Sequence, residues 1–351
     1  MHQGATIFFL AVYIAVLGAA GIFLGSKRHI DIKNSLSPEQ TQDRAPQPSP
    51  SPTPVVPTSP ITGLPCDHAD RRPIAVMLSG DPATRPLSGL SEADLIIEMP
   101  VTASQITRLM ALYQCHEPKD IGSVRSARHD FLPLAASFGA IYAHWGGSHF
   151  ALDQLKTNIL DNIDALPNPF GAFYRKRGIA PHNGFTDFAR LWNAAINLKY
   201  TLIETPRQYF AHINAEDGAA RQGQSEGAGT PASTIQLPYN GRDFAVRWEY
   251  DTPSRRWRRF RGNAPEIDKH SRAQVTAAVV VVLKTTQKHL EDQYIDVAVL
   301  GRGSATVYQL GSAVSGAWVK TDFDDILRII DVSGKDIALT PGNIWIEMVT
   351  Q

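Results

Sequence analysis

The chain has 351 residues, with 34 Lys and Arg against 34 Asp and Glu, two cysteines and 43% hydrophobic residues. This composition excludes a disordered tail and a disulfide-rich scaffold, and the length suggests two domains. The formal net charge of zero excludes a general attraction to nucleic acid or anionic lipid, so binding of a polyanion requires a local patch.

The N-terminal segment predicts a membrane anchor. From Ala5 to Gly25 the only ionisable side chain is the phenol of Tyr13, and as a helix this stretch is about 31 Å long, enough to cross a bilayer. No Lys or Arg precedes it, and cleavage after Ala20 would leave an apolar new N-terminus. We therefore expect an uncleaved anchor over residues 1–28 rather than a signal peptide or a buried helix.

Residues 29–60 have the composition of a disordered linker. Seven prolines lie between positions 46 and 60, among Ser, Thr and Gln, which favours extended polyproline II and excludes a core. The segment is interpreted as a stalk, with Pro-x-x-Pro docking ligands as the alternative.

Sequence features disagree on which side of the membrane the globular part lies. Lys27 and Arg28 directly follow the anchor and favour a cytoplasmic location by the positive-inside rule. The stalk favours the outside, as does the pair Cys66 and Cys115 if it is oxidised; two unrelated buried thiols are the alternative.

Strand and helix patterns alternate over residues 61–205, which predicts a mixed α/β N-terminal domain. We expect strands over 73–78, 93–99, 106–113 and 140–143, and helices over 130–138 and 185–198.

Beyond residue 199 the pattern changes. A flexible loop is expected over 218–230, and residues 232–351 predict a β-rich C-terminal domain, with strands over 244–250, 277–283, 305–310 and 344–349. The expected fold class is therefore α+β, with a transmembrane helix, a Pro-rich linker and these two domains.

Cations of the N-terminal domain concentrate on predicted turns. Arg85 and Arg108 come first, and the motif Gly122–Arg128 then adds Arg125, Ser126 and Arg128. Guanidinium forks beside Gly and Ser suit a carboxylate or phosphate, which makes these residues candidates for an anion site. Structural ion pairs with the nearby acidic residues Glu92, Asp94 and Glu98 are the alternative.

Two further turns carry histidine. His144 ends a predicted strand and leads into Gly146 and Gly147, and His182 precedes Asn183 after a proline. Such positions favour ligand contacts, although each histidine can equally make a structural hydrogen bond.

The catalytic alternatives for these turns remain open. No His-x-x-x-His helix motif, paired-cysteine motif or Gly-x-Ser-x-Gly elbow is present, so we expect no metal, no cofactor and no serine hydrolase. General acid–base catalysis by His144 or His182 with Glu98 is allowed by the residue types.

The segment 255–261 places five arginines around two aromatic residues. Single-stranded nucleic-acid binders use this combination, but a hairpin strand with solvated arginines explains it equally well. The balanced charge and the anchor argue against a nucleic-acid partner.

Taken together, the motifs resemble the YerB-like family of bacterial envelope lipoproteins, a two-part domain of unknown function, over residues 61–349. The motifs that carry the resemblance are 61–65, 72–77, 85–94, 106–112, 122–128, 144–148, 180–183, 248–251 and 341–347. The resemblance implies an extracytoplasmic protein with an α/β part and a β-rich part, and it implies no reaction, substrate or cofactor.

Two departures from the family pattern stand out. No cysteine precedes Cys66, so a lipid anchor is not expected and the N-terminal helix would take over that role. The family's Pro-His-x-Asp reads here as Pro265-Glu266-Ile267-Asp268, without the histidine.

The sequence supports the hypothesis of a single-pass cell-membrane protein whose extracytoplasmic part binds an anionic envelope ligand through the Arg and His turns. An envelope hydrolase or transferase using His144 or His182, with Glu98 or Asp268 as partner, is one alternative. A structural module that binds another protein through Trp145, Trp257 and Phe260 is the other.

Overall fold

The computed structural model describes residues 56–351, except for 206, 214–228, 240 and 242. The expected anchor over 1–28, most of the linker and most of the loop expected over 218–230 lie outside the described residues. Within the described ranges, no helix combines the length and the apolar character needed to cross a bilayer.

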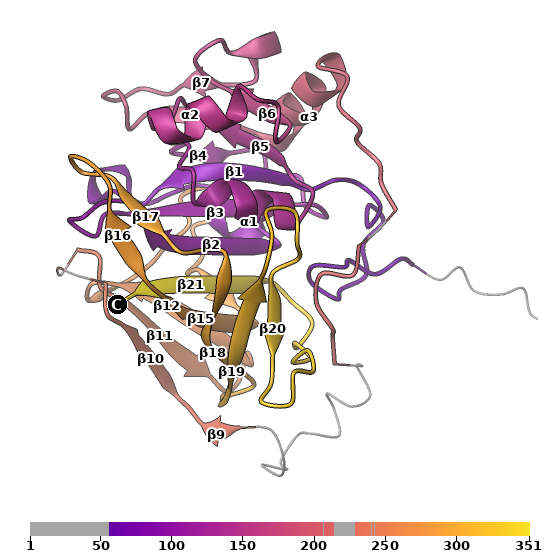
Figure 1. The fold of residues 1–351 in the computed structure, drawn as a ribbon, viewed down its shortest axis with the longest axis vertical. Helices are drawn as coiled ribbons and strands as arrows, with labels where there is room; N and C mark the ends of the chain where they lie inside the picture. The colour runs from indigo at the N-terminus through magenta and orange to yellow at the C-terminus, as the bar shows by residue number, and fades with distance from the viewer. Residues whose placement is uncertain (1–55, 206, 214–228, 240, 242) are drawn as a thin grey trace, which may run out of the picture. The chain divides into compact units, whose positions relative to one another are not determined.

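A sheet of eleven described strands organises the fold (Figure 1). In spatial order they are β20 (Arg328–Ile330), β19 (Ser312–Lys320), β18 (Gly301–Gln309), β15 (Val279–Thr285), β21 (Ile344–Thr350), β2 (Leu95–Pro100), β3 (Thr107–Tyr113), β1 (Ile74–Ser79), β5 (Ile141–His144) and β6 (Asn162–Asp164), with β9 (Thr230–Pro231) on β19. Strands β2 and β21 pair in parallel at its centre. The expected strands of both halves are present, and all belong to this sheet except the strand expected over 244–250, which is β11 (Val246–Asp251) of a second sheet.

Smaller elements surround this sheet. A second sheet contains β10 (Thr234–Leu237), β11 (Val246–Asp251), β12 (Arg256–Arg261), β13 (Ala264–Pro265) and β14 (Thr276–Ala277). Two further small sheets contain β4 (Ile121–Gly122), β8 (Gly184–Thr186) and β7 (Tyr174–Arg175), and β16 (Gln287–His289) and β17 (Ile295–Val297). The helices are α1 (Phe131–Ser137), α2 (His149–Leu155) and α3 (Phe188–Asn197), with 3-10 turns η1 (Pro82–Thr84), η2 (Leu90–Glu92) and η3 (Pro169–Gly171).

The expected helices over 130–138 and 185–198 correspond to α1 and α3. The second begins later than expected because Asp187 caps it: its carboxylate accepts a hydrogen bond from the backbone N–H of Arg190 at 2.8 Å. The three preceding residues form strand β8 instead.

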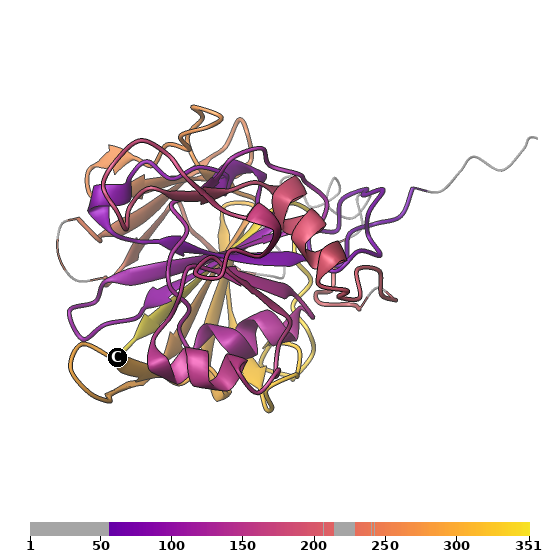
Figure 2. The same ribbon diagram turned by 90° about the horizontal axis from the view of Figure 1, so that it is seen from above.

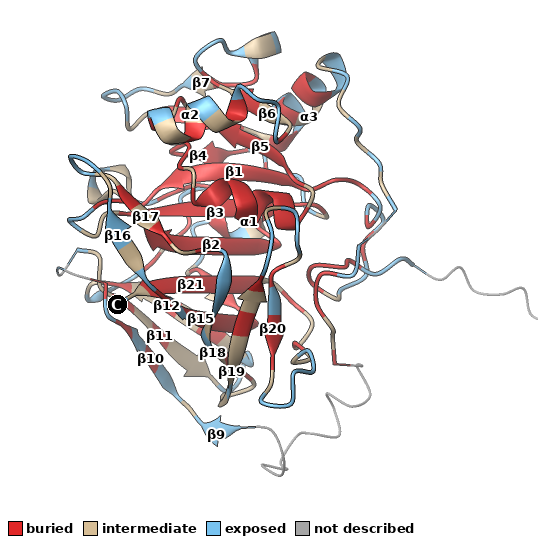
Figure 3. Ribbon diagram, viewed as in Figure 1, coloured by how far each residue is buried: buried red, intermediate tan, exposed pale blue. Residues whose placement is uncertain are grey.

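Both faces of the main sheet are covered, so its central strands β1, β2 and β3 are buried at every position (Figure 3). On one face Ile97 packs in a core with Phe131 of α1, and Figure 2 shows the magenta helices α1 and α2 on this side. On the other face Ile96 packs in a core with Trp248 and Trp257 of the second sheet. Neighbouring residues of one strand therefore enter different cores.

The helices of the described residues fall in the N-terminal half, and the C-terminal half is formed by strands, as its composition predicts. The parallel pairing of β2 with β21 joins the two halves through backbone hydrogen bonds. An edge strand of either half would otherwise leave its backbone groups unpaired. The pairing of β2 with β21, which connects the two halves, is therefore part of the central core.

A disulfide joins Cys66 to Cys115, 49 positions apart in the sequence. It ties the segment before β1 to the chain just after β3. Such a bond stabilises the fold mainly by restricting the unfolded chain, and the effect grows with the length of the enclosed loop.

We expect the double variant Cys66→Ser, Cys115→Ser to lose about 4 kcal/mol of unfolding free energy, because about 50 residues are released from the closed loop. Urea denaturation followed by tryptophan fluorescence measures this loss. The wild type in excess reductant is the matched control and should show the same loss. A loss below about 1 kcal/mol in both samples would contradict the assigned bond.

Candidate functional site

The motif Gly122–Arg128 and the turn after His144 lie side by side in the structure. The backbone N–H of Trp145 donates to the carbonyl of Arg125 at 3.0 Å, and that of Ala127 donates to the carbonyl of Gly146 at 2.8 Å. The N–H of Arg125 bonds in turn to Met77 on β1 at 2.8 Å. The motif therefore lies between the carboxyl ends of the parallel strands β1 and β5, where α/β sheets commonly bind ligands.

The glycine pair of this turn is explained by close packing. Gly146 has a φ of +58°, which favours glycine. A Cβ on Gly147 would lie 3.1 Å from the Cβ of Ala127 and equally close to Leu152. The two glycines thus let the arginine-bearing loop approach β5.

Three of the four candidate arginines gather at this edge of the sheet. Arg108 is the second residue of β3 and pairs with Ser79, the last residue of β1, and Arg125 and Arg128 lie on the loop before α1. Burial lowers the pKa of Arg108, and the charges of Arg128 and Arg125 lower it further. Burial also lowers the pKa of Arg125 and of Arg128. We call Arg108, Arg125 and Arg128 the arginine cluster.

Carboxylates compensate the arginine cluster only from a distance, since the charge of Asp81 raises the pKa of Arg108 and Arg125 against the effect of burial. Among the described residues, no Asp or Glu forms an ion pair with any of its three members. Their Nε atoms are buried, and no described residue accepts a hydrogen bond from them. Arg108 and Arg128 donate to the backbone carbonyls of Thr107, at 3.2 Å, and Ala127, at 2.9 Å. The cluster therefore keeps positive charge and free donors, which suit an anion with several oxygens.

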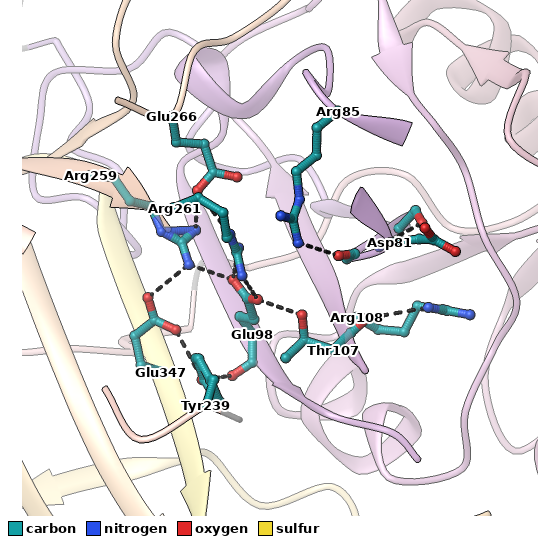
Figure 4. Close-up of polar contacts among 12 residues, drawn as sticks. Asp81, Arg85, Glu98, Thr107, Arg108, Tyr239, Arg259, Arg261, Glu266 and Glu347 are labelled. Carbon is teal, nitrogen blue, oxygen red and sulfur yellow. Dashed lines mark hydrogen bonds and ion pairs between the residues drawn. The ribbon is translucent and has the colours of Figure 1, made fainter. Parts of the chain in front are cut away.

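Arg85 makes other contacts than these three arginines, and Figure 4 shows its side chain between Arg261 and Asp81. Its guanidinium donates to the carbonyl of Gly80 at 2.6 Å and to that of Asp243. Burial lowers its pKa to about 10, with repulsion by Arg261 as the next cause. The structure thus associates Arg85 with a set of buried ions around Glu98.

Glu98 is fully buried and is held by two arginines of β12 (Figure 4). Both terminal nitrogens of Arg261 bind its carboxylate at 2.8 Å, and Arg259 binds it at 2.6 Å. The hydroxyl of Thr107 donates a further hydrogen bond at 2.6 Å. Burial alone would raise the pKa of Glu98, but the charges of Arg261 and Arg259 outweigh it and hold this pKa well below its usual value.

Glu347 on β21 lies directly beside Glu98 on β2. Its carboxylate is 3.2 Å from Arg259 and accepts hydrogen bonds of 3.0 Å from the Trp248 indole and from the Tyr239 hydroxyl. Burial raises the pKa of Glu347 to about 7, because the attraction of Arg259 is opposed by the charge of Glu98. This pair of neighbouring acids therefore ionises unequally.

The ion cluster is the set Glu98, Glu347, Glu266, Arg259 and Arg261. Arg259 is 3.2 Å from Glu266, and its guanidinium lies 3.9 Å from the ring centre of Trp345. Its side chain has no exposed surface. A carboxylate so enclosed cannot exchange protons readily with a ligand, so the geometry favours a structural role for Glu98.

His144 is likewise enclosed. Its residue has no exposed surface, its Nδ1 lies 2.9 Å from the carbonyl of Gly146, and its Nε2 lies 3.2 Å from Oδ1 of Asn162. Both ring nitrogens are therefore engaged in fixing the turn that packs against the arginine loop. This arrangement supports a positioning role more than proton transfer.

The other candidates lie at the margin of this edge. His182 is half-buried, and no described residue bonds its Nδ1. The amide of Asn183 donates to the carbonyls of Lys176, at 2.9 Å, and Gly178, at 3.1 Å, and thereby closes the turn between β7 and β8. Ser126 is half-exposed beside Arg125. Asp268 accepts backbone hydrogen bonds from Ser91 and its own turn.

Sequence reasoning missed the ion cluster, although a signal was present. The arginine-rich segment 255–261 forms β12, and alternation places Trp257, Arg259 and Arg261 on its buried side. The interpretation as a strand with solvated arginines is therefore wrong for Arg259 and Arg261. Trp257 is fully buried, so the expectation that it is exposed in a protein-binding surface with Trp145 and Phe260 is wrong. Its apolar side chain could have indicated which side of the strand faces the core.

One group of potential metal ligands exists among the described residues. His129, Asp130 and Asp296 place one ligand atom each within 4.8 Å of one another. The sequence analysis did not consider them, because Asp296 lies more than 160 positions beyond the other two.

Comparison with known proteins identifies two matching family models. The "Protein of unknown function (DUF3048) N-terminal domain" matches residues 61–201, and the corresponding C-terminal domain matches residues 235–346. The protein named "Putative lipoprotein YerB" of Bacillus subtilis (strain 168) is 29% identical over 298 residues, which are 83% of this chain and 86% of that protein. A crystal structure of YerB from Bacillus subtilis matches with a TM-score of 0.73 and 25% identity, covering 84% of this chain and 97% of the other.

We expect Glu98→Gln to lower the unfolding free energy by about 3–5 kcal/mol, because Arg259 and Arg261 would remain buried with too little negative charge. Chemical denaturation measures the change. The matched control is Glu249→Gln, which removes a half-exposed pair with Arg247 and should cost less than about 1 kcal/mol. Equal effects in the two variants would refute the central role of the ion cluster.

A second prediction concerns pH. The pKa of Glu347 is raised from 4.5 to about 7. Between these two pH values the folded protein keeps the proton of this carboxyl group, whereas the unfolded chain releases it. Its contribution to stability is complete below about pH 4.5 and is lost as the pH rises through about 7, with a slope of at most about 1.4 kcal/mol per pH unit.

The variant Glu347→Gln cannot titrate, so we expect the difference in unfolding free energy between it and the wild type to change across this window. Denaturation curves at half-unit pH steps provide the measurement. A difference that is constant from pH 4.5 to 7.5 would show that the glutamate is not protonated preferentially in the folded protein.

Proposed function

The chain belongs to the DUF3048 family, and from this premise we propose that it is a membrane-attached envelope protein that binds an anionic ligand through the arginine cluster. The observation that carries the proposal is that Arg108, Arg125 and Arg128 lie together at the carboxyl ends of β1 and β5 without an ion-pair partner among the described residues, and with buried Nε atoms that no described residue bonds. Three buried or half-buried guanidinium groups repel one another, so the arrangement costs stability unless a ligand uses it.

The contrast with the ion cluster supports a binding role. Arg259 and Arg261 form ion pairs with Glu98 at 2.6–2.8 Å, whereas the hydrogen bonds of Arg108 and Arg128 go to backbone carbonyls. Planar guanidinium groups match the oxygens of phosphate and carboxylate groups. A multiply charged anion, such as a phosphorylated or polycarboxylate envelope component, would supply the missing negative charge.

The proposed location has its own support. The apolar segment 5–25 is long enough for an anchor, and the Bacillus relative carries the word "lipoprotein" in its printed name. The disulfide between Cys66 and Cys115 favours an oxidising compartment outside the cytoplasm. In this proposal the Pro-rich linker holds the globular part away from the membrane surface.

The hydrolase hypothesis receives less support from the geometry. Both ring nitrogens of His144 are engaged, and Glu98 is enclosed by arginines. His182 keeps a free ring nitrogen among the described residues, but no described carboxylate pairs with it. Binding therefore remains the better supported function.

The test is isothermal titration of the full-length protein in detergent with inorganic pyrophosphate and, separately, with citrate. We expect saturable binding of at least one anion that weakens as salt is added. Arg125→Gln should lower the affinity about tenfold or more, since one charge-assisted hydrogen bond contributes about 1.5–3 kcal/mol.

The matched control is Arg328→Gln, because Arg328 is exposed and paired with Asp336 at 2.9 Å, away from the cluster. It should leave the affinity unchanged. Without ligand, Arg125→Gln should melt at a higher temperature than the wild type, because one of three repelling charges is gone. Unchanged affinity in Arg125→Gln, or a melting temperature lowered by several degrees, would contradict the proposed role.

A further inference from the structure

A pocket of about 370 Å³ opens beside the start of α1. Its walls come from α1 and from the chain at and after β17, including His129, Asp130, Asp296, Leu300 and Phe323. Two carboxylates and one imidazole therefore face a space that is large enough for solvent or a small ligand. These three residues are distinct from the arginine cluster and from the ion cluster.

The separations of their ligand atoms match those around a metal ion. Nε2 of His129 lies 3.0 Å from Oδ1 of Asp130 and 3.4 Å from Oδ1 of Asp296. Ligands held about 2.1 Å from a tetrahedral zinc ion are about 3.4 Å apart. An ion could thus enter with little movement of these side chains, in place of the proton on Nε2.

The surroundings of Asp130 point to a missing ligand. Its side chain is 2% exposed, and no described residue donates a hydrogen bond to its Oδ2. Its Oδ1 accepts one from the backbone N–H of Val297 at 3.2 Å. A buried carboxylate oxygen without a donor is costly, and a cation in the pocket would remove that cost.

The neighbouring groups leave the coordinating atoms available. Lys288 on β16 binds Oδ2 of Asp296 at 2.8 Å, which leaves Oδ1 directed to His129. The carboxylates of Asp130 and Asp296 face Nε2 of His129 and favour a proton on it, and a bound ion would displace that proton. The neutral imidazole can therefore offer Nε2 as a ligand.

We propose that His129, Asp130 and Asp296 bind a divalent first-row transition-metal ion, zinc or manganese, with its remaining coordination positions open to the pocket. A mixed nitrogen and carboxylate donor set suits these ions, whereas calcium requires six to eight oxygen ligands. This site goes beyond the proposed anion binding and does not depend on it. It shares only the turn that carries Arg128, whose guanidinium lies 5.4 Å from the ring centre of Tyr294, two residues before Asp296.

The test is titration of the tag-free, full-length protein in detergent with ZnCl₂, after treatment with a chelator and its removal. Calorimetry should show one saturable site, and Mn²⁺ should compete for it. The described cysteines are joined in a disulfide and offer no thiolate. His129→Ala and Asp296→Asn should each lower the zinc affinity about tenfold or more.

The matched control is His149→Ala, because His149 also pairs with a carboxylate, Glu291 at 3.0 Å, but is half-exposed and outside the group. It should retain the wild-type affinity. If His129→Ala does not fold, Asp296→Asn decides, since the side chain of Asp296 is 32% exposed and tolerates an isosteric change.

Three results would overturn the proposal. The first is the absence of saturable zinc binding in the wild type, which would leave the group as an ordinary ion pair between α1 and β17. The second is an unchanged zinc affinity in Asp296→Asn. The third is an equal loss in His149→Ala, which would mean that zinc binds surface histidines without a defined site.

Discussion

The pairing of β2 with β21 places two buried glutamates, Glu98 and Glu347, side by side at the centre of the main sheet. Like charges opposite each other on neighbouring strands repel, and burial strengthens this repulsion. The arrangement is tolerated because two arginines of the second sheet contact these carboxylates. Arg259 forms ion pairs with both Glu98 and Glu347, and Arg261 forms one with Glu98. This constraint couples the two halves of the chain. The buried glutamates of the main sheet are stable only beside the two arginines, and the arginines reach them only in the present register of β12. A shift of β12 by one residue would turn both guanidinium groups away from the carboxylates.

Arginine serves two opposite purposes in this protein. In the ion cluster, each guanidinium is matched by carboxylates, which makes the core specific to one arrangement. In the arginine cluster, Arg108, Arg125 and Arg128 lie close together without ion-pair partners among the described residues. Folding tolerates that cost only if other interactions exceed it, and sites that bind ligands commonly carry such a cost. The net charge of the whole chain is zero, but the arginine cluster is a local excess of positive charge.

The proposed anion site and the proposed metal site meet on one short turn. Arg128 ends the motif Gly122–Arg128, and His129 and Asp130 follow it at the start of α1. The turn is positioned by backbone hydrogen bonds to β1 and to the residues after β5. Because these bonds come from the rigid sheet, the arginines and the carboxylates keep a defined relation to each other. A metal ion and an anion bound here would lie near opposite ends of this turn, on the same edge of the fold.

The sequence by itself determined the longer strands β1, β2, β3 and β5 and the helices α1 and α3 of the N-terminal half, the β-rich character of the other half and the family to which the chain belongs. Periodicity and turn residues carry that information locally. Tertiary structure alone decided that Arg85 bonds to the carbonyls of Gly80 and Asp243, that Glu98 is enclosed, and that Asp296 meets His129 and Asp130. Sequence spacing does not encode which distant strands pair, because pairing depends on the burial of whole faces. The chemistry of a carboxylate or guanidinium depends on the charges that this pairing brings within a few ångströms.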